Sequence, residues 1–244
     1  MLDYETLMDM EGLEEKDVWE LSEIKQIEQI LPAEISTEVP GYEQALVCGN
    51  PFDIAQELDC FQGYDNPYGA FGTCGLTSIA NICHLAGFEV SEPQVVEYAM
   101  ENGLCEKAEN GKWGGGTTVS NQLDILKHYD IKAHCEFPDV ADCERIADAI
   151  EGGHGVMVGL NSGILQDREW KIYDENGEIY AGHTVCMTGT VRDVETGELL
   201  GFYLCVSSAQ KADGAKQYVS VEKFEKCYTD SVCAYAVITD EPIR

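Results

Sequence analysis

Apolar residues recur every three or four positions through much of the first half of the chain, which is the spacing of one helix face. In the clearest run, Cys74 comes first, Leu76, Ile79 and Cys83 share one face, and Gly87 ends the pattern. The same spacing predicts further helices at residues 91–103, 119–129 and 140–150. Cys74 is therefore expected at the amino terminus of a helix.

The second half of the chain changes to short apolar runs of the length and composition of β-strands. Turn sequences such as Asn176-Gly177 separate them. We expect strands at residues 131–137, 155–160, 171–173, 183–191, 199–206, 217–221 and 232–239. Helices followed by an antiparallel sheet predict an α+β fold.

The amino-terminal segment has a different character from the rest. Its first 45 residues hold 13 acids and two lysines, and apolar residues from Val18 to Leu31 follow helical spacing until Pro32. We interpret residues 1–50 as an acidic helix and a connector, and residues 51–244 as the main domain. Because no signal peptide or membrane-spanning stretch is recognisable, a cytoplasmic location is expected.

Charge narrows the choice of partner. The chain carries 15 Lys and Arg against 45 Asp and Glu, a net charge of −30. Such a surface repels phosphate backbones and anionic lipids, so neither nucleic acid nor a membrane is expected as a partner. A peptide or protein substrate fits better, in particular a basic one.

The eleven cysteines do not form a recognisable disulfide or metal pattern. Their number is odd, and no Cys-x-x-Cys pair occurs. His183 and Cys186 would point to opposite faces of a strand, so no metal is predicted. The loop at 114–118 lacks the Gly-Lys-Ser/Thr ending of a phosphate loop, and no cofactor is expected.

Two residues have the placement that thiol catalysis requires. Cys74 would lie where unpaired N–H groups and the helix dipole favour a thiolate. His183 follows a glycine at the head of an apolar strand, far from Cys74 in sequence, as expected of a partner base. The alternative interpretation of Cys74 is a buried helical cysteine like Cys83.

These motifs, Gly72-Thr73-Cys74-Gly75-Leu76-Thr77-Ser78 and Gly182-His183-Thr184-Val185, resemble those of the papain-like cysteine peptidase superfamily, in particular bacterial C39-like peptidase domains. The resemblance spans about residues 61–239. It implies a cleft between a helical half and a sheet half, in which Cys74 attacks a carbonyl group and His183 exchanges the proton.

The resemblance also implies two supporting residues, and this sequence departs from the pattern at both. Gln62 would be the oxyanion donor, about twice as far upstream of the cysteine as usual, with Asn66 as the fallback. The position that orients the histidine, usually Asn or Asp, falls on Ser207. Either a Cys-His pair suffices, or another carboxylate such as Asp213 substitutes, or catalysis has been lost.

Fold analogy further places Gly115, Gly116 and Asn161 beside the substrate. The leading hypothesis is a hydrolase that cleaves a peptide or amide bond through an acyl-enzyme. Acyl transfer and deamidation use the same intermediate and remain open. An inactive member that binds a peptide without cutting it is the alternative from another class.

Overall fold

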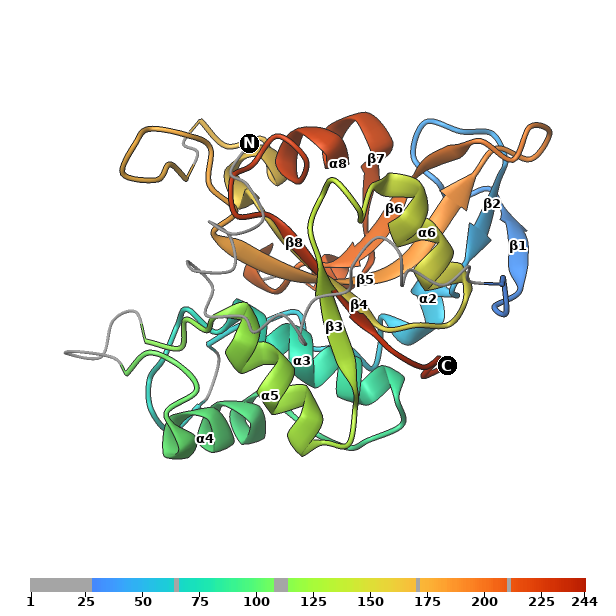
Figure 1. Cartoon of the computed structure of the whole chain (residues 1–244). Helices are drawn as coiled ribbons and strands as arrows, with labels where there is room; N and C mark the ends of the chain where they lie inside the picture. Colours follow the sequence, from blue (N-terminus) through green and yellow to red (C-terminus); the bar gives the residue numbers. More distant parts are fainter. Residues whose placement is uncertain (1–27, 64–65, 108–113, 170–171, 210–211) are drawn as a thin grey trace.

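The computed structural model describes residues 28–63, 66–107, 114–169, 172–209 and 212–244 (Figure 1). In these ranges the chain forms an antiparallel sheet with helices against both faces, which confirms the α+β class. Most of the predicted acidic helix falls on residues 1–27, outside the described residues. The domain division at residue 50 stays a prediction.

Among the described residues the sheet has eight strands in the order β1-β2-β5-β4-β8-β3, with β6 and β7 extending from β5. The strands are β1 (Ala33–Ser36), β2 (Ala45–Cys48), β3 (Ala133–Glu136), β4 (Val156–Leu160), β5 (His183–Arg192), β6 (Leu199–Cys205), β7 (Gln217–Ser220) and β8 (Tyr235–Thr239). Strand β5 bonds to β4 and β2 along one edge and to β6 along the other. It is therefore the central and most firmly held strand.

Helices cover both faces of this sheet. They are α2 (Pro51–Ile54), α3 (Cys74–Leu85), α4 (Glu92–Asn102), α5 (Val119–His128), α6 (Cys143–Glu151), α7 (Ser162–Leu165) and α8 (Val221–Cys227). In Figure 1, α3, α4 and α5 gather on one side and α6 and α8 on the other. Along β4, Met157 belongs to the same core as Ile79 of α3, while Val158 belongs to the same core as Phe224 of α8. The period-two alternation of a strand thus supplies both cores.

Several short elements differ from the sequence prediction. Residues 32–50, predicted as a connector, contain β1 and β2, and the run Ala45–Cys48 pairs with β5 through residues 46–48. The predicted strand 171–173 contributes only a bridge from Tyr173 to Ile179. Helices α2, α7 and α8 were not predicted, because segments of four to seven residues are too short for periodicity to identify.

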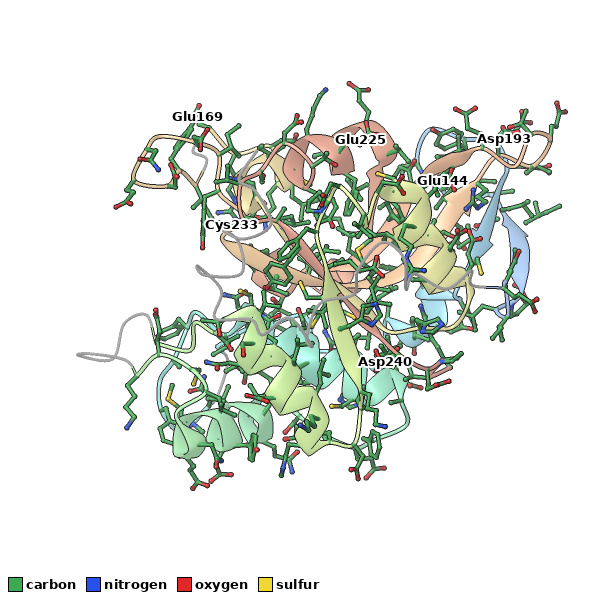
Figure 2. The ribbon with its side chains drawn as sticks, in the orientation of Figure 1. Glu144, Glu169, Asp193, Glu225, Cys233 and Asp240 are labelled. Carbon is green, nitrogen blue, oxygen red and sulfur yellow. The ribbon has the colours of Figure 1, made fainter. Side chains whose placement is uncertain are left out.

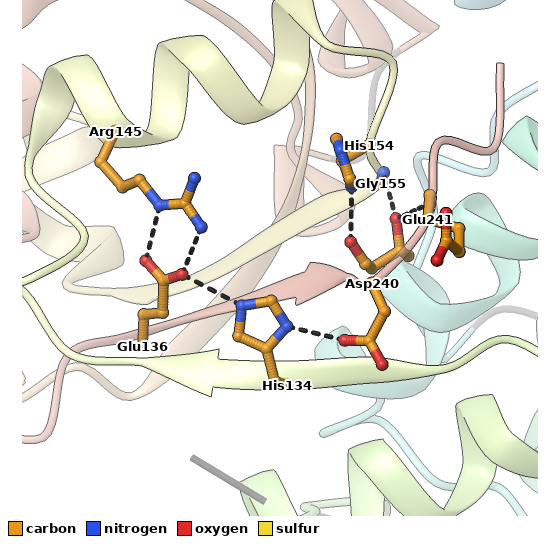
Figure 3. Close-up of polar contacts among 8 residues, drawn as sticks. His134, Glu136, Arg145, His154, Gly155, Asp240 and Glu241 are labelled. Carbon is orange, nitrogen blue, oxygen red and sulfur yellow. Dashed lines mark hydrogen bonds and ion pairs between the residues drawn. The ribbon is translucent and has the colours of Figure 1, made fainter. Parts of the chain in front are cut away.

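An ionic network joins β3, β8 and α6 on the edge of the sheet (Figure 3). The ring nitrogens of His134 lie 3.0 Å from Glu136 Oε1 and 2.8 Å from Asp240 Oδ1. The guanidinium of Arg145, in α6, donates to both oxygens of Glu136, at 3.1 and 2.6 Å. His134 and Glu136 are almost completely buried. The network therefore pairs charges that would be costly to bury alone.

Acidic side chains are exposed on the surface of the protein. Glu144, Glu169 and Glu225 are exposed and lie at the periphery of the molecule (Figure 2). No helix in the described part of the chain combines the length and apolar character needed to cross a bilayer.

Candidate active site

Cys74 is the first residue of α3, and small residues surround it. A Cβ at Gly75 would lie 2.7 Å from Thr117 Cγ2, and Gly72 donates its N–H to Gly114 O at 3.0 Å. The first N–H groups of a helix have no carbonyl partner within the helix. They are therefore available to the Cys74 sulfur and to a ligand beside it.

The histidine is brought to this helix by the central strand. His183 is the first residue of β5, and the N–H of the following residue, Thr184, donates to Cys74 Sγ at 3.5 Å. Ser78, one turn into α3, donates to Thr184 O at 3.3 Å. Cys74 and His183 both line a cleft of about 1080 Å³. The structure thus brings together the two residues predicted as nucleophile and base.

Cys74 is distinguished from most of the other cysteines by its accessibility. All eleven are free thiols; nine are buried, and only Cys74 and Cys143 are partly exposed. Cys143 begins α6 and does not line the cleft. Cys74 is thus a partly exposed thiol beside a histidine, whereas Cys83 is a core residue.

Burial keeps both members of the pair uncharged at rest. It raises the pKa of the Cys74 thiol, although the N–H groups of Thr184 and Gly75 oppose the rise. Burial, followed by the positive charge of Arg168, lowers the pKa of His183 to about 4. At neutral pH the site therefore holds a thiol and a neutral imidazole, the form in which a histidine can accept a proton.

The histidine is oriented by Ser208 and not by Ser207. Ser208 Oγ lies 3.2 Å from His183 Nε2, whereas Ser207 Oγ donates to Gln62 Oε1 at 3.0 Å. Both serines belong to the 3₁₀ turn Ser207–Ala209, in which successive side chains point in different directions. Since Nε2 faces Ser208, Nδ1 is the nitrogen left for the thiol. The side chain of Asp213, the predicted substitute, lies outside the described residues.

A polar chain continues from Ser208 along the cleft. Gln166 Nε2 donates to Ser208 Oγ at 2.7 Å, and Arg168 Nη2 donates to Gln166 Oε1. Gln166 and Arg168 both line the cleft. The resemblance implies a group that stabilises the protonated form of His183. Here the row of hydrogen bonds from Ser208 leads to the cation Arg168, whose positive charge makes protonation of His183 less favourable.

Gln62 lines the cleft although it lies twelve positions before Cys74 in the sequence. Its Nε2 donates to Phe71 O at 2.9 Å, and its backbone N–H donates to Ser207 O at 3.1 Å. Asn66 closes the intervening loop with two hydrogen bonds to Ala70, so its amide serves the turn. A side-chain amide has two N–H bonds, and Gln62 therefore retains one for a ligand oxygen.

The predicted substrate-binding residues have different outcomes. Gly116 lines the cleft. Gly115 adopts a positive φ and lies behind the cleft, where a Cβ would be 2.5 Å from Thr73 Cγ2. Asn161 is completely buried, donates to Ile172 O and Tyr180 O, and accepts from Ile164 N. Both N–H bonds of its amide are used within the fold, and Asn161 is not among the residues that line the cleft.

Sequence reasoning missed the hydroxyl network behind the nucleophile. Tyr235 OH lies 2.8 Å from Thr184 Oγ1 and accepts from Gln122 Nε2 at 2.8 Å. The Thr184 side chain in turn bonds the Cys74 sulfur. No local sequence signal links these residues, because they come from α5, β5 and β8.

A second missed residue is the buried carboxyl group of Glu92, the first residue of α4. It is completely buried, and its Oε1 accepts from Gly63 N at 3.2 Å. Burial raises the pKa of Glu92 to about 6, although hydrogen bonds from Thr73 and Gly63 oppose the rise. The carboxyl group thus lies between the segment of Gln62 and the residue before Cys74.

Within the described ranges, no group of three or more His, Cys, Asp or Glu side chains is placed to hold a metal ion.

Comparisons with known proteins add little. The fold is similar to the crystal structure of a double glycine motif protease from an AMS/PCAT transporter in complex with the leader peptide, with 14% identity and a TM-score of 0.40, over 69% of this chain and 84% of that chain. No protein-family model matches, and neither does any curated protein.

Exchanging each serine for alanine separates their roles. Ser208→Ala removes the partner of His183 Nε2, so we expect the ¹⁵N resonance of Nε2 to move. Ser207→Ala leaves that contact intact and is expected to change the side-chain amide resonances of Gln62. If Ser207→Ala moved the histidine resonance and Ser208→Ala did not, the assignment of Ser208 would be overturned.

Removing the cation at the end of the polar chain should activate the thiol. In Arg168→Gln the pKa of His183 rises from about 4 toward its usual value, because one of the two causes of the decrease is gone. A protonated imidazole stabilises a thiolate, so iodoacetamide should alkylate Cys74 about three- to tenfold faster between pH 5 and 7. Peptide mass spectrometry measures the rate. Lys226→Gln, at an exposed position of α8, is the control and should have no effect.

Neutralising the buried carboxylate should stabilise the fold. The pKa of Glu92 is higher in the folded than in the unfolded chain, so its contribution to stability falls as pH rises from about 4.5 to about 6. Glu92→Gln should therefore raise the free energy of unfolding at pH 7 by about 2 kcal/mol. Urea denaturation at pH 4.5 and pH 7 measures this. Exposed Glu97→Gln on the same helix is the control, and an equal gain in both variants would contradict the prediction.

Proposed function

We propose that this protein is a papain-like cysteine hydrolase that cleaves a peptide or amide bond, with Cys74 as nucleophile and His183 as base. The observation that carries the proposal is the contact between the two elements. Cys74, at the amino terminus of α3, accepts a hydrogen bond from the residue that follows His183 in β5, and both side chains line one cleft. A nucleophile and a base in this relation are the requirement for thiol catalysis.

The reaction starts from the neutral pair. As the substrate carbonyl group reaches Cys74, the thiol proton passes to His183 Nδ1, and the sulfur forms a bond to the carbonyl carbon. The backbone N–H of Cys74 and the remaining N–H of Gln62 donate to the developing oxyanion. The imidazolium then gives its proton to the leaving amine, and the C–N bond breaks to leave a thioester.

Water completes the cycle. His183 accepts a proton from a water molecule, whose oxygen adds to the thioester carbonyl carbon. The C–S bond then breaks, the carboxylic acid product leaves, and the proton returns to Cys74. An amine that replaces this water would make the protein an acyltransferase, and a side-chain amide as substrate would make it a deamidase.

A second candidate is a module that binds a peptide in the cleft without cutting it. The lowered pKa of His183, together with Ser208 in place of an Asn or Asp, favours it. A binding module has no need of a partly exposed thiol and a histidine in the same cleft, so the first candidate accounts for more of the site.

Digestion of a random peptide library, read by mass spectrometry, tests the hydrolase. Wild-type protein should produce defined new termini, and Cys74→Ala should produce none. His183→Ala should slow cleavage about a thousandfold or more, and Gln62→Ala about a hundredfold. Cys143→Ala, which removes the other partly exposed thiol, is the matched control and should cut like the wild type.

The two candidates give opposite results in this experiment. If the wild type captures peptides but never cleaves them, the hydrolase is ruled out and the binding module is the candidate that remains. Cleavage that persists in Cys74→Ala would overturn the assignment of the nucleophile.

A further inference from the structure

Two charged side chains among the residues that line the cleft stand on its opposite walls. Glu106 lines the cleft together with Gly116, Thr117, Thr118 and Asn121, and these five residues are here called the helical wall. Arg168 follows α7 and, through Gln166 and Ser208, lies on the side of His183, here called the sheet wall. A ligand in the cleft therefore meets a negative charge on one side of the catalytic pair and a positive charge on the other.

The helical wall holds Glu106 at a fixed place. Its N–H donates to Gly116 O at 2.8 Å, and its carbonyl oxygen accepts from Gly115 N at 2.8 Å. A Cβ at Gly116 would lie 3.1 Å from Glu106 Oε2, so the carboxylate covers the glycine that forms the cleft surface. From there the wall continues through Thr117, which contacts Gly75 beside the nucleophile. The carboxylate is thus part of the surface that a bound peptide follows.

The charge of Glu106 is not neutralised by its described surroundings. The other lining residues of the helical wall, Thr117, Thr118 and Asn121, are uncharged. Lys107 follows Glu106 in the sequence, but no ion pair joins Glu106 to Lys107 or to another described residue. The Glu106 side chain is exposed. Its negative charge is therefore available to a ligand.

The charge of the whole chain acts in the same direction. A net charge of −30 attracts a cationic peptide from a distance and repels an anionic one. Inside the cleft, Arg168 repels a cationic group from the sheet wall. A cationic group is thus directed to Glu106, which also fixes the direction in which the peptide lies.

We propose that the helical wall at Glu106 is a subsite for a basic group of the substrate, so that the substrate class is a peptide with a lysine or arginine side chain near the bond that is cut. The inference rests on the proposed function, since it names the substrate of the same cleft. Specificity would then come from Glu106 and the surrounding charge, while the bond is cut by the neutral pair.

The test compares matched peptides that differ at one position. For a peptide cleaved from the library, lysine, glutamine and glutamate are placed in turn at each position on both sides of the scissile bond. At one position, we expect kcat/KM for lysine to exceed that for glutamine by about fivefold, which is the contribution of an exposed ion pair. The preference should weaken as salt rises from 50 to 500 mM, because salt screens the pair.

Charge reversal identifies the residue responsible. In Glu106→Gln the ratio of lysine to glutamine peptide should fall to about one, and in Glu106→Lys the glutamate peptide should become the better substrate. Glu101→Gln, at an exposed position of α4 that does not line the cleft, should keep the wild-type ratio. A lysine preference that survives Glu106→Lys, or no preference at any position, would overturn the inference.

A binding measurement separates this inference from the proposed function. A library peptide that Cys74→Ala protein captures is labelled with a fluorophore and carries the same lysine, glutamine and glutamate substitutions. Its binding to Cys74→Ala protein is measured by anisotropy, which requires no cleavage. If the wild type cuts nothing while Cys74→Ala binds the lysine peptide about fivefold more tightly than Cys74→Ala/Glu106→Gln, the hydrolase fails and the subsite stands. If peptides are cut and both proteins bind them equally, the subsite fails alone.

Discussion

The site depends on one contact, between the amino terminus of α3 and the start of β5. Thr184 donates its N–H to the sulfur of Cys74, and Ser78 donates back to the carbonyl oxygen of Thr184. Strand β5 is bonded on both edges, and α3 is packed into the core below it, so neither element can move without disrupting the fold. The backbone, more than any side chain, fixes where Cys74 stands relative to His183.

The surroundings of this contact keep both Cys74 and His183 in their uncharged forms. Burial raises the pKa of Cys74 and lowers that of His183, and the chain from Ser208 to Arg168 ends in a cation where an imidazolium would need an anion. The thiolate of Cys74 and the imidazolium of His183 are therefore disfavoured at rest. The thiol proton is transferred only as the sulfur forms its bond to the substrate carbonyl carbon. Cys74 should therefore react slowly with small electrophiles in solution and faster with a substrate that fills the cleft.

The sequence predicted the elements that carry a periodic signal and missed contacts between distant loops. Helix α4, with its capping box of Ser91 and Gln94, and strand β5 follow directly from their patterns. Gln62 was identified from its residue type, but only the turn closed by Asn66 explains how it reaches the cleft from so far upstream. Ser208 and Ser207 are adjacent and chemically equal in sequence. The 3₁₀ turn that separates their directions has no periodicity to predict it.

In the cleft, the residues proposed to react are uncharged, and the charged residues lie on the walls around them. The groups proposed to make and break bonds are uncharged at rest. His183 is buried and Cys74 is partly buried, so a permanent charge on either would be costly. The permanent charges stand on the walls, where water screens them and they cost little. Arg168 is connected to His183 through Gln166 and Ser208, whereas Glu106 is held by backbone bonds to Gly115 and Gly116. A change at Arg168 therefore reaches the reacting pair, and a change at Glu106 reaches the ligand, so the two walls can vary independently.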